Sequence, residues 1–248
     1  MNATDVERLR VPPLDLTHVL DDHPGDATAI EDPVETFDYG SLADAAHFLA
    51  DSLGDVGVDA GTRVGVLTTG TIATTITLCA LSRRGATAAL VDTAALPSYV
   101  RGRLRSADIE FLLADLDAEQ LLDDILIEGN IDELPTIVAE TFTLARFASR
   151  ADEEASDMIF LDGSRPPIAL GWGELVAVGR AIAEKRGLGE RSTLTVPPRI
   201  DRPGAVAAVF AGLSVGASVR VGRPPERTRL DTKFMHEDKF MHEEKDEQ

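Results

Sequence analysis

The chain has 248 residues and carries 43 acidic against 24 basic side chains, a formal net charge of −19 with histidine neutral. Hydrophobic residues make up 44% of the sequence, too many for a disordered acidic protein and enough to form a sizeable core. The charge argues against binding of DNA, RNA or an anionic membrane, because it would repel their phosphates. The acids are spread along the whole chain, which disfavours the alternative of a DNA mimic.

The composition also predicts where the protein works. Lysine occurs only at positions 185, 233, 239 and 245, and acidic residues and alanine are abundant, a pattern that favours a cytoplasmic protein adapted to high salt. The single cysteine, Cys79, excludes an intrachain disulfide and is expected to be a buried small hydrophobe. We find neither a signal peptide nor a run of about 18 apolar residues that would cross a membrane.

Short apolar runs separated by turn residues predict alternating strands and helices from residue 36 onward. In chain order these are a strand at 36–39, a helix capped by Ser41 and ended by Gly54 and Gly57, a buried strand at 63–67, a helix at 71–84 stopped by Gly85, and then a strand at 87–91, a helix at 97–107 and a strand at 111–114. This alternation predicts an α/β fold of mostly parallel sheets flanked by helices.

The middle of the chain is less regular. The acidic stretch 115–133 predicts an amphipathic helix, ended by Pro135, and 136–138 predicts a strand after it. Residues 149–156 are charged and indicate a surface linker, and the apolar residues 158–161 then resume the sheet.

The second half of the sequence echoes the first. Helix starts follow Tyr39-Gly40 and Trp172-Gly173, and glycine-containing turns at Gly85 and Gly216 each precede a strand. We therefore interpret 36–92 and 169–222 as an approximate internal duplication, within one domain at 1–222.

Residues 223–248 form a linker and an acidic tail that repeats a hexad, Lys233 to Asp238 and then Lys239 to Glu244. A solvated tail is the simplest interpretation. The alternatives are a docking peptide anchored by the Phe-Met pairs, and metal capture by His236 and His242.

Common catalytic signatures are missing from the sequence. It contains no G-x-x-x-x-G-K-[ST], no G-x-S-x-G and no H-E-x-x-H, and Gly171, Gly173 and Gly179 lack dinucleotide-binding spacing. His18, His23 and His47 have no evident partner and are interpreted as surface residues rather than general bases.

Three segments carry a family resemblance: Phe37 to Leu42, Val58 to Leu67, and Arg84-Gly85-Ala86 with Val91-Asp92. Together with Phe111 to Asp115, they resemble the N-terminal subdomain of AMP-forming acyl-CoA synthetases over roughly residues 30–222. The resemblance implies that subdomain's fold and a ligase ancestry. Complete members continue into a second subdomain and a C-terminal domain carrying a catalytic lysine, none of which we recognise before Gln248.

The resemblance also places a phosphate loop after the strand at 157–160. In the family this loop is rich in Ser, Thr and Gly and ends in Pro-Lys-Gly, whose amides, hydroxyls and lysine hold the ATP phosphates. Here it reads Leu161 to Pro167, is about two residues shorter, and has Pro167 in the place of the lysine. Proline offers neither a charge nor an amide proton. The candidate nucleotide-binding residues are therefore a degenerate set, Asp162, Gly163, Ser164 and Arg165.

The resemblance thus favours a truncated, catalytically inactive relative that acts as a binding or regulatory module with a protein partner or by self-association. We assign it no catalytic residues and no metal site, and we expect no cofactor. ATP or AMP with Mg would bind only if the degenerate loop keeps some affinity for nucleotide. A second hypothesis is a component of an AMP-forming acid–CoA ligase that is completed by a partner chain. A third is an α/β protein of another family that resembles this one by chance.

Overall fold

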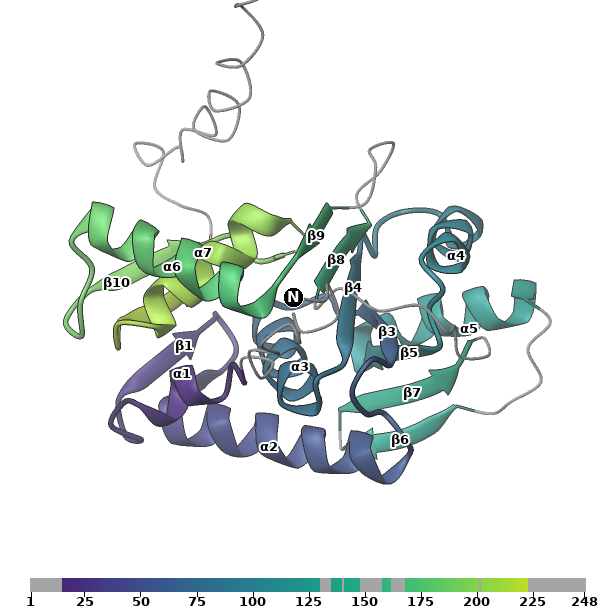
Figure 1. Ribbon diagram of the computed structural model, residues 1–248, viewed down its shortest axis with the longest axis horizontal. Coiled ribbons are helices and arrows are strands. Elements are labelled where there is room, and N and C mark those ends of the chain that lie inside the picture. Colours follow the sequence, from purple (N-terminus) through teal and green to yellow (C-terminus); the bar gives the residue numbers. More distant parts are fainter. Residues whose placement is uncertain are drawn as a thin grey trace, which may run out of the picture.

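The computed structural model describes residues 15–129, 135–139, 141–147, 158–161, 168–200 and 202–222. These residues form two β-sheets, of seven and four strands, with helices between and around them (Figure 1). The predicted linker at 149–156 and the tail from residue 223 lie outside this part of the chain.

The larger sheet has a parallel centre and antiparallel edges. Its order is β6 (Thr136–Ala139), β7 (Phe142–Arg146), β5 (Phe111–Asp115), β3 (Arg63–Leu67), β4 (Thr87–Val91), β8 (Met158–Leu161) and β9 (Ile168–Leu170). Strands β5, β3, β4 and β8 are parallel, and the pairs β5–β7, β6–β7 and β8–β9 are antiparallel. Every residue of β3, β4 and β5 is buried, as their continuous apolar runs predict.

Helices cover both faces of this sheet. Side chains of α3 (Thr71–Arg84) share a core with Val66 and Leu90, whereas α4 (Pro97–Ser106) and α5 (Glu119–Gly129) share one with Leu67 and Val91. A short 3₁₀ helix, η1 (Leu116–Ala118), leads into α5. The packing under α4 is close, since a Cβ at Gly65 would lie 2.7 Å from Leu104 Cδ2.

The smaller sheet has the order β10 (Thr193–Val196), β11 (Ser218–Val221), β1 (Thr28–Glu31) and β2 (Thr36–Asp38). Its first three strands are parallel. In β10 and β11 the side chains alternate between buried and more exposed positions, whereas β1 buries two consecutive residues, Ala29 and Ile30. Leu194, Val219 and Ile30 form a buried cross-strand row, and Thr195, Arg220 and Glu31 form the next row on the opposite face. In these two rows one face of the sheet is therefore apolar and the other is polar.

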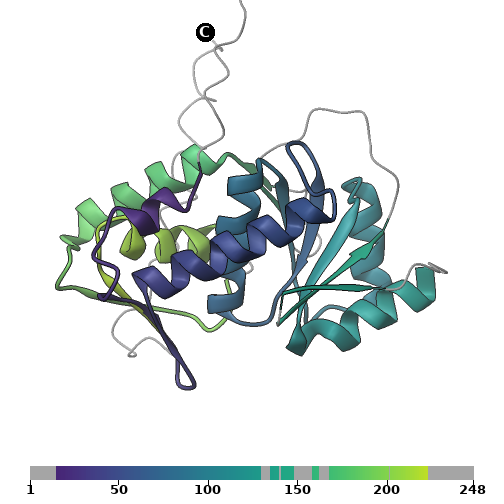
Figure 2. The same cartoon turned by 90° about the horizontal axis from the view of Figure 1, so that it is seen from below.

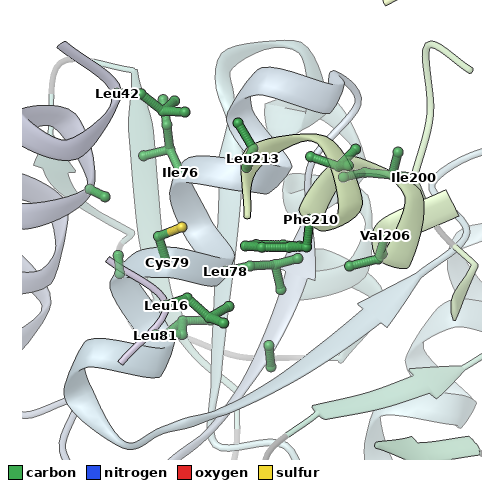
Figure 3. Close-up of a cluster of buried hydrophobic side chains, with 14 of the residues drawn as sticks. Leu16, Leu42, Ile76, Leu78, Cys79, Leu81, Ile200, Val206, Phe210 and Leu213 are labelled. Carbon is green, nitrogen blue, oxygen red and sulfur yellow. The ribbon is translucent and has the colours of Figure 1, made fainter. Parts of the chain in front are cut away.

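The core lies between the two sheets, where α2 (Tyr39–Asp55), α3 and α7 (Pro203–Leu213) meet (Figure 3). Helix α2 contacts α3 and also touches β1 and β6, so it spans both sheets (Figure 2). Helix α7 packs against α6 (Trp172–Arg186). The first described helix, α1 (His18–Asp21), lies on α2.

The structure corrects several predicted details. Helix α2 begins at Tyr39, and its cap is Asp38, whose carboxylate accepts a hydrogen bond from the Ser41 amide at 2.7 Å; Ser41 itself lies inside the helix. The acidic stretch after Asp115 forms η1 and then α5, rather than one helix from residue 115. The sequence did not predict helices α1 and α7 or strands β1, β7 and β9.

Residues 36–92 and 169–222 contain comparable element orders. The first gives β2–α2–β3–α3–β4, and the second gives the end of β9 followed by α6–β10–α7–β11. The last two strands pair in parallel in both stretches. The duplication stays an interpretation that this order supports. No helix within the described ranges is long and apolar enough to cross a membrane.

Candidate functional site

The candidate site lies at the carboxyl edge of the parallel strands β5, β3, β4 and β8. Open α/β sheets bind ligands at this edge, in the crevices between the segments that leave the strands. Here those segments begin at Thr68 after β3, at Asp92 after β4 and at Leu116 after β5. The connection between β10 and α7 reaches the same edge through Arg199.

The predicted nucleotide-binding residues Asp162, Gly163, Ser164 and Arg165 lie outside the described residues, as does Pro167. The two strands on either side of them, β8 and β9, belong to the described residues. Leu161, the last residue of β8, is in register with Val91 of β4, and β9 starts at Ile168 in register with Phe160. Strand β8 therefore ends next to the end of β4, on the side of β4 away from β3.

Asp92 and Arg199 form the principal charged contact of this edge. The Arg199 guanidinium donates through Nη2 to Asp92 Oδ1 at 2.6 Å and to Thr93 Oγ1 at 3.1 Å. Asp92 also accepts a hydrogen bond from the Ala94 amide at 2.9 Å. That amide, with help from Arg199 and the charge of Arg202, holds the pKa of Asp92 below its ordinary value.

A second carboxylate, Asp115, stands at the end of β5. Its Oδ2 accepts from the Thr69 amide at 2.8 Å and from the Thr69 hydroxyl at 3.2 Å, and its Oδ1 accepts from the Ala118 amide at 3.0 Å. Burial nevertheless raises the pKa of Asp115, because the loss of hydration outweighs these donors. Asp115 thus ties the turn after β3 to the turn after β5.

A small hollow separates the ends of β3 and β4. It is lined by apolar side chains, two threonines and one arginine: Val66, Leu90, Val91, Ile200, Thr68, Thr74 and Arg199. The Thr74 hydroxyl donates to the Gly70 carbonyl at 2.7 Å and lies 2.7 Å from the Thr68 hydroxyl. The hollow has a volume of about 10 Å³, room for about one water molecule and far less than a nucleotide needs.

The described part of this edge therefore offers a guanidinium, which is paired with one of two carboxylates, and several hydroxyls. Among the described residues, no three His, Cys, Asp or Glu side chains come together as metal ligands. The three described histidines lie elsewhere. His18 and His47 each approach Asp21 Oδ2 at 4.0 Å, and the His23 ring centre lies 4.9 Å from that of Tyr39.

Sequence reasoning missed Arg199, Thr93 and Asp115 as site residues, and it used Asp92 only as part of the family resemblance. A signal was available for Asp92 and Asp115, since each stands where a predicted buried strand ends. Arg199 lies more than 100 residues from Asp92 in the sequence, and no local pattern connects the two.

Comparison with known proteins gives a family and a fold. The profile of the AMP-binding enzyme family matches residues 16–169. A search of curated proteins by sequence finds no match.

Solved structures match most of the chain. A long-chain fatty-acid–CoA ligase from Archaeoglobus fulgidus is 18% identical with a TM-score of 0.69, and the match covers 87% of this chain and 48% of the ligase. The N-terminal domain of FACL13 from Mycobacterium tuberculosis, solved with an inhibitor, is 15% identical with a TM-score of 0.66. That match covers 86% of this chain and 58% of the FACL13 domain. The o-succinylbenzoate coenzyme A synthetase from Bacillus subtilis is 16% identical with a TM-score of 0.62. That match covers 85% of this chain and 46% of the synthetase. At these identities the likeness shows the fold, and the chain spans about half the length of the structures it matches.

Proposed function

Because this chain belongs to the AMP-binding enzyme family, we propose that it is a catalytically inactive member that works as a binding or regulatory module. The observation that carries the proposal is the sequence of the loop after β8, where Pro167 takes the place of a phosphate-binding lysine. The family fold is retained in the strands on both sides of that loop.

The chemistry of the loop supports a loss of ATP affinity. A lysine contributes a point charge to a phosphate, and a backbone amide contributes a hydrogen bond, whereas proline contributes neither. Asp162 adds a negative charge where the charges of a triphosphate need neutralising, and Arg165 offers one cation in return. The described edge nearby adds Asp92 and Asp115, and the Asp92 carboxylate already holds Arg199. The balance of charge at this edge is unfavourable to a polyphosphate.

The second candidate is a component of an AMP-forming acid–CoA ligase that binds an acyl or nucleotide ligand and is completed by a partner chain. In its favour, the match covers 48% and 46% of two ligases that resemble the chain in fold. In this case ATP and Mg would bind in the complex, and the reaction would be an acid–thiol ligation. A ligase assay in the presence of candidate partner chains separates this candidate from the first.

We further propose that the chain binds a protein partner or a second copy of itself. The polar face of the four-stranded sheet, with Thr195, Arg220 and Glu31 in one row, suits exposure to water rather than burial against a partner. The Phe-Met pairs of the tail are the better candidate anchors. Deleting residues 231–248 should lower the mass that light scattering measures in molar salt. A full chain that is already monomeric, and unchanged by the deletion, would contradict self-association.

The central experiment is a calorimetric titration of the chain with ATP and with a non-hydrolysable acyl-adenylate analogue, in high salt with Mg present. We expect no saturable ATP binding by the chain. Pro167→Lys should bind ATP measurably, because it restores both the charge and the amide. Pro166→Lys is the matched control, since it adds the same charge one residue earlier. Saturable ATP binding by the unaltered chain would overturn the proposal.

A further inference from the structure

Helix α4 presents a cationic surface in an acidic protein. Its ten residues include Arg101, Arg103 and Arg105 and no acid. By contrast, α2 carries three acids and α5 carries four, and neither of these two helices has a lysine or an arginine. With a net charge of −19 the chain relies on acids for its solubility, so the charge of α4 calls for another explanation.

The outward side of α4 combines this charge with apolar groups. Leu96, the N-cap residue, is 74% exposed, and Tyr99 is 41% exposed. Tyr99, Gly102 and Arg105 follow at three-residue intervals, so they are neighbours on the helix surface, and all three are exposed. The opposite side of the helix is buried against the larger sheet. We call Leu96, Tyr99, Gly102 and Arg105 the α4 face.

The sequence of the tail at 231–248 has the complementary chemistry. It carries seven acids against three lysines, and two Phe-Met pairs recur six residues apart, at 234–235 and 240–241. Phe and Met side chains pack well on apolar and aromatic groups such as those at the start of α4. A carboxylate beside them forms a charge-assisted pair with an arginine such as Arg105. The tail therefore matches the α4 face in both charge and apolar character.

The position of α4 favours the tail of a second copy. The tail continues from β11, which belongs to the smaller sheet. Helix α4 lies on the other face of the larger sheet, opposite to α3 and to the core that the two sheets share (Figure 1). The tail of a neighbouring copy reaches α4 directly, whereas the chain's own tail would have to pass around the larger sheet.

We propose that the α4 face is the docking site for the acidic tail of a second copy of this chain. The inference rests on the self-association proposed above, and it names the surface that receives the tail. A Phe-Met pair contacts Leu96 and Tyr99, and a neighbouring carboxylate of the tail pairs with Arg105. Because each copy offers one α4 face and one tail, a two-fold dimer forms two such contacts at once.

In molar salt the two kinds of contact contribute differently. The Debye length falls to about 3 Å, so the tail acids attract Arg105 in direct contact and not from a distance. The apolar contacts of the Phe-Met pairs do not depend on this screening and supply most of the affinity. The arginines decide which helix the tail selects, because the acids of α2 and α5 repel an acidic segment that touches them.

The experiment compares the full chain with two glycine variants by light scattering in molar potassium chloride. Gly102→Glu places a carboxylate in the centre of the α4 face. Its Cβ position is open and glutamate has the higher helix propensity, so the fold is kept. We expect association to weaken at least tenfold, because like charges then meet at the contact. Gly173→Glu adds the same charge at an exposed, equally open position of α6 and should associate as the unaltered chain does.

A mixing experiment shows whether the contact lies between copies. The Gly102→Glu chain keeps an intact tail, and a chain lacking 231–248 keeps an intact α4 face and all the described residues. Neither should associate alone. Their mixture should form a heterodimer through the one remaining contact, with a mass above that of either chain. Arg105→Glu, at an exposed position, replaces Gly102→Glu in both experiments should that variant fail to fold by circular dichroism.

The outcomes separate this inference from the self-association on which it rests. If deletion of 231–248 lowers the mass but Gly102→Glu does not, the tail docks elsewhere and the α4 face is rejected, while self-association stands. A full chain that is monomeric overturns both. A mixture that stays monomeric, although each variant alone has lost association, rejects the exchange of tails between copies.

Discussion

The Tyr39 hydroxyl donates a hydrogen bond to the Ala217 carbonyl oxygen at 3.0 Å, and it also lies 3.3 Å from the Leu213 carbonyl oxygen. It thereby ties the start of α2 to the turn between α7 and β11. Tyr39 is 1% exposed, and burial raises the pKa of its hydroxyl.

Tyr39→Phe should lower the free energy of unfolding by about 1–2 kcal/mol, because it removes the donor while the two buried carbonyl oxygens remain. Urea denaturation in molar salt measures this loss. A variant as stable as the parent would show that the carbonyls find other donors.

How much of this structure the sequence could predict depends on the kind of element. The predicted ranges 63–67, 71–84 and 87–91 agree with β3, α3 and β4 at both ends, because long apolar runs there are bounded by glycine and turn residues. Helix α7 was missed because it is buried on nearly all sides and shows no amphipathic period. Strand β9 is three residues long and uniformly apolar, so it lacks the alternation that predicted β2.

The candidate site was less predictable than the fold. Asp92 and Arg199 meet because β4 and the segment after β10 end at the same edge, and this follows from the arrangement of two sheets rather than from any local motif. The Asp38 cap was missed for a smaller reason. Asp38 and Ser41 are both good capping residues, and the helix starts at the earlier of the two.

Two glycines of α6 should respond in opposite ways to alanine. A Cβ at Gly179 would lie 3.0 Å from the Ala211 amide nitrogen and 3.1 Å from the Phe210 carbonyl carbon, both backbone atoms of α7 that cannot move aside. We expect Gly179→Ala to cost about 1–3 kcal/mol of stability through this overpacking.

Gly173→Ala is the matched control, since no heavy atom beyond its chain neighbours and the nearby backbone of its own helix lies within 4 Å of its Cβ position. It should leave stability unchanged or raise it by up to about 1 kcal/mol, through its higher helix propensity. Thermal melts of the two variants make the comparison. Equal melting temperatures would show that α6 and α7 are not packed as described.

The two carboxylates of the candidate site should give opposite pH dependences. The pKa of Asp92 is lowered, so its contribution to stability is present above its ordinary value of 3.8 and is lost as pH falls through the lower folded value. The pKa of Asp115 is raised, so its contribution is complete below 3.8 and declines as pH rises through the higher folded value.

Urea denaturation of the parent, Asp92→Asn and Asp115→Asn across the acidic range measures both effects. The stability difference between parent and variant should grow with rising pH for Asp92 and shrink for Asp115. Parallel curves for the two variants would contradict the assigned environments.

Stability should also depend strongly on salt. A net charge of −19 on 248 residues implies self-repulsion within the folded state. Added potassium chloride shortens the Debye length from about 10 Å at 0.1 M to about 3 Å at 1 M and screens that repulsion. The melting temperature should therefore rise from dilute to molar salt, and a melting temperature indifferent to salt would refute adaptation to high salt.

The proposed inactivity is tested most directly by ATP–pyrophosphate exchange with a panel of carboxylic acids in molar salt with Mg. An active family ligase assayed in parallel serves as the positive control. On the proposed interpretation of the loop, in which Pro167 stands where the family has its phosphate-binding lysine, we predict exchange no faster than in a blank without protein. Exchange well above that blank with any acid, and lost on substitution of Arg165, would show that the loop still binds ATP and would contradict the proposal.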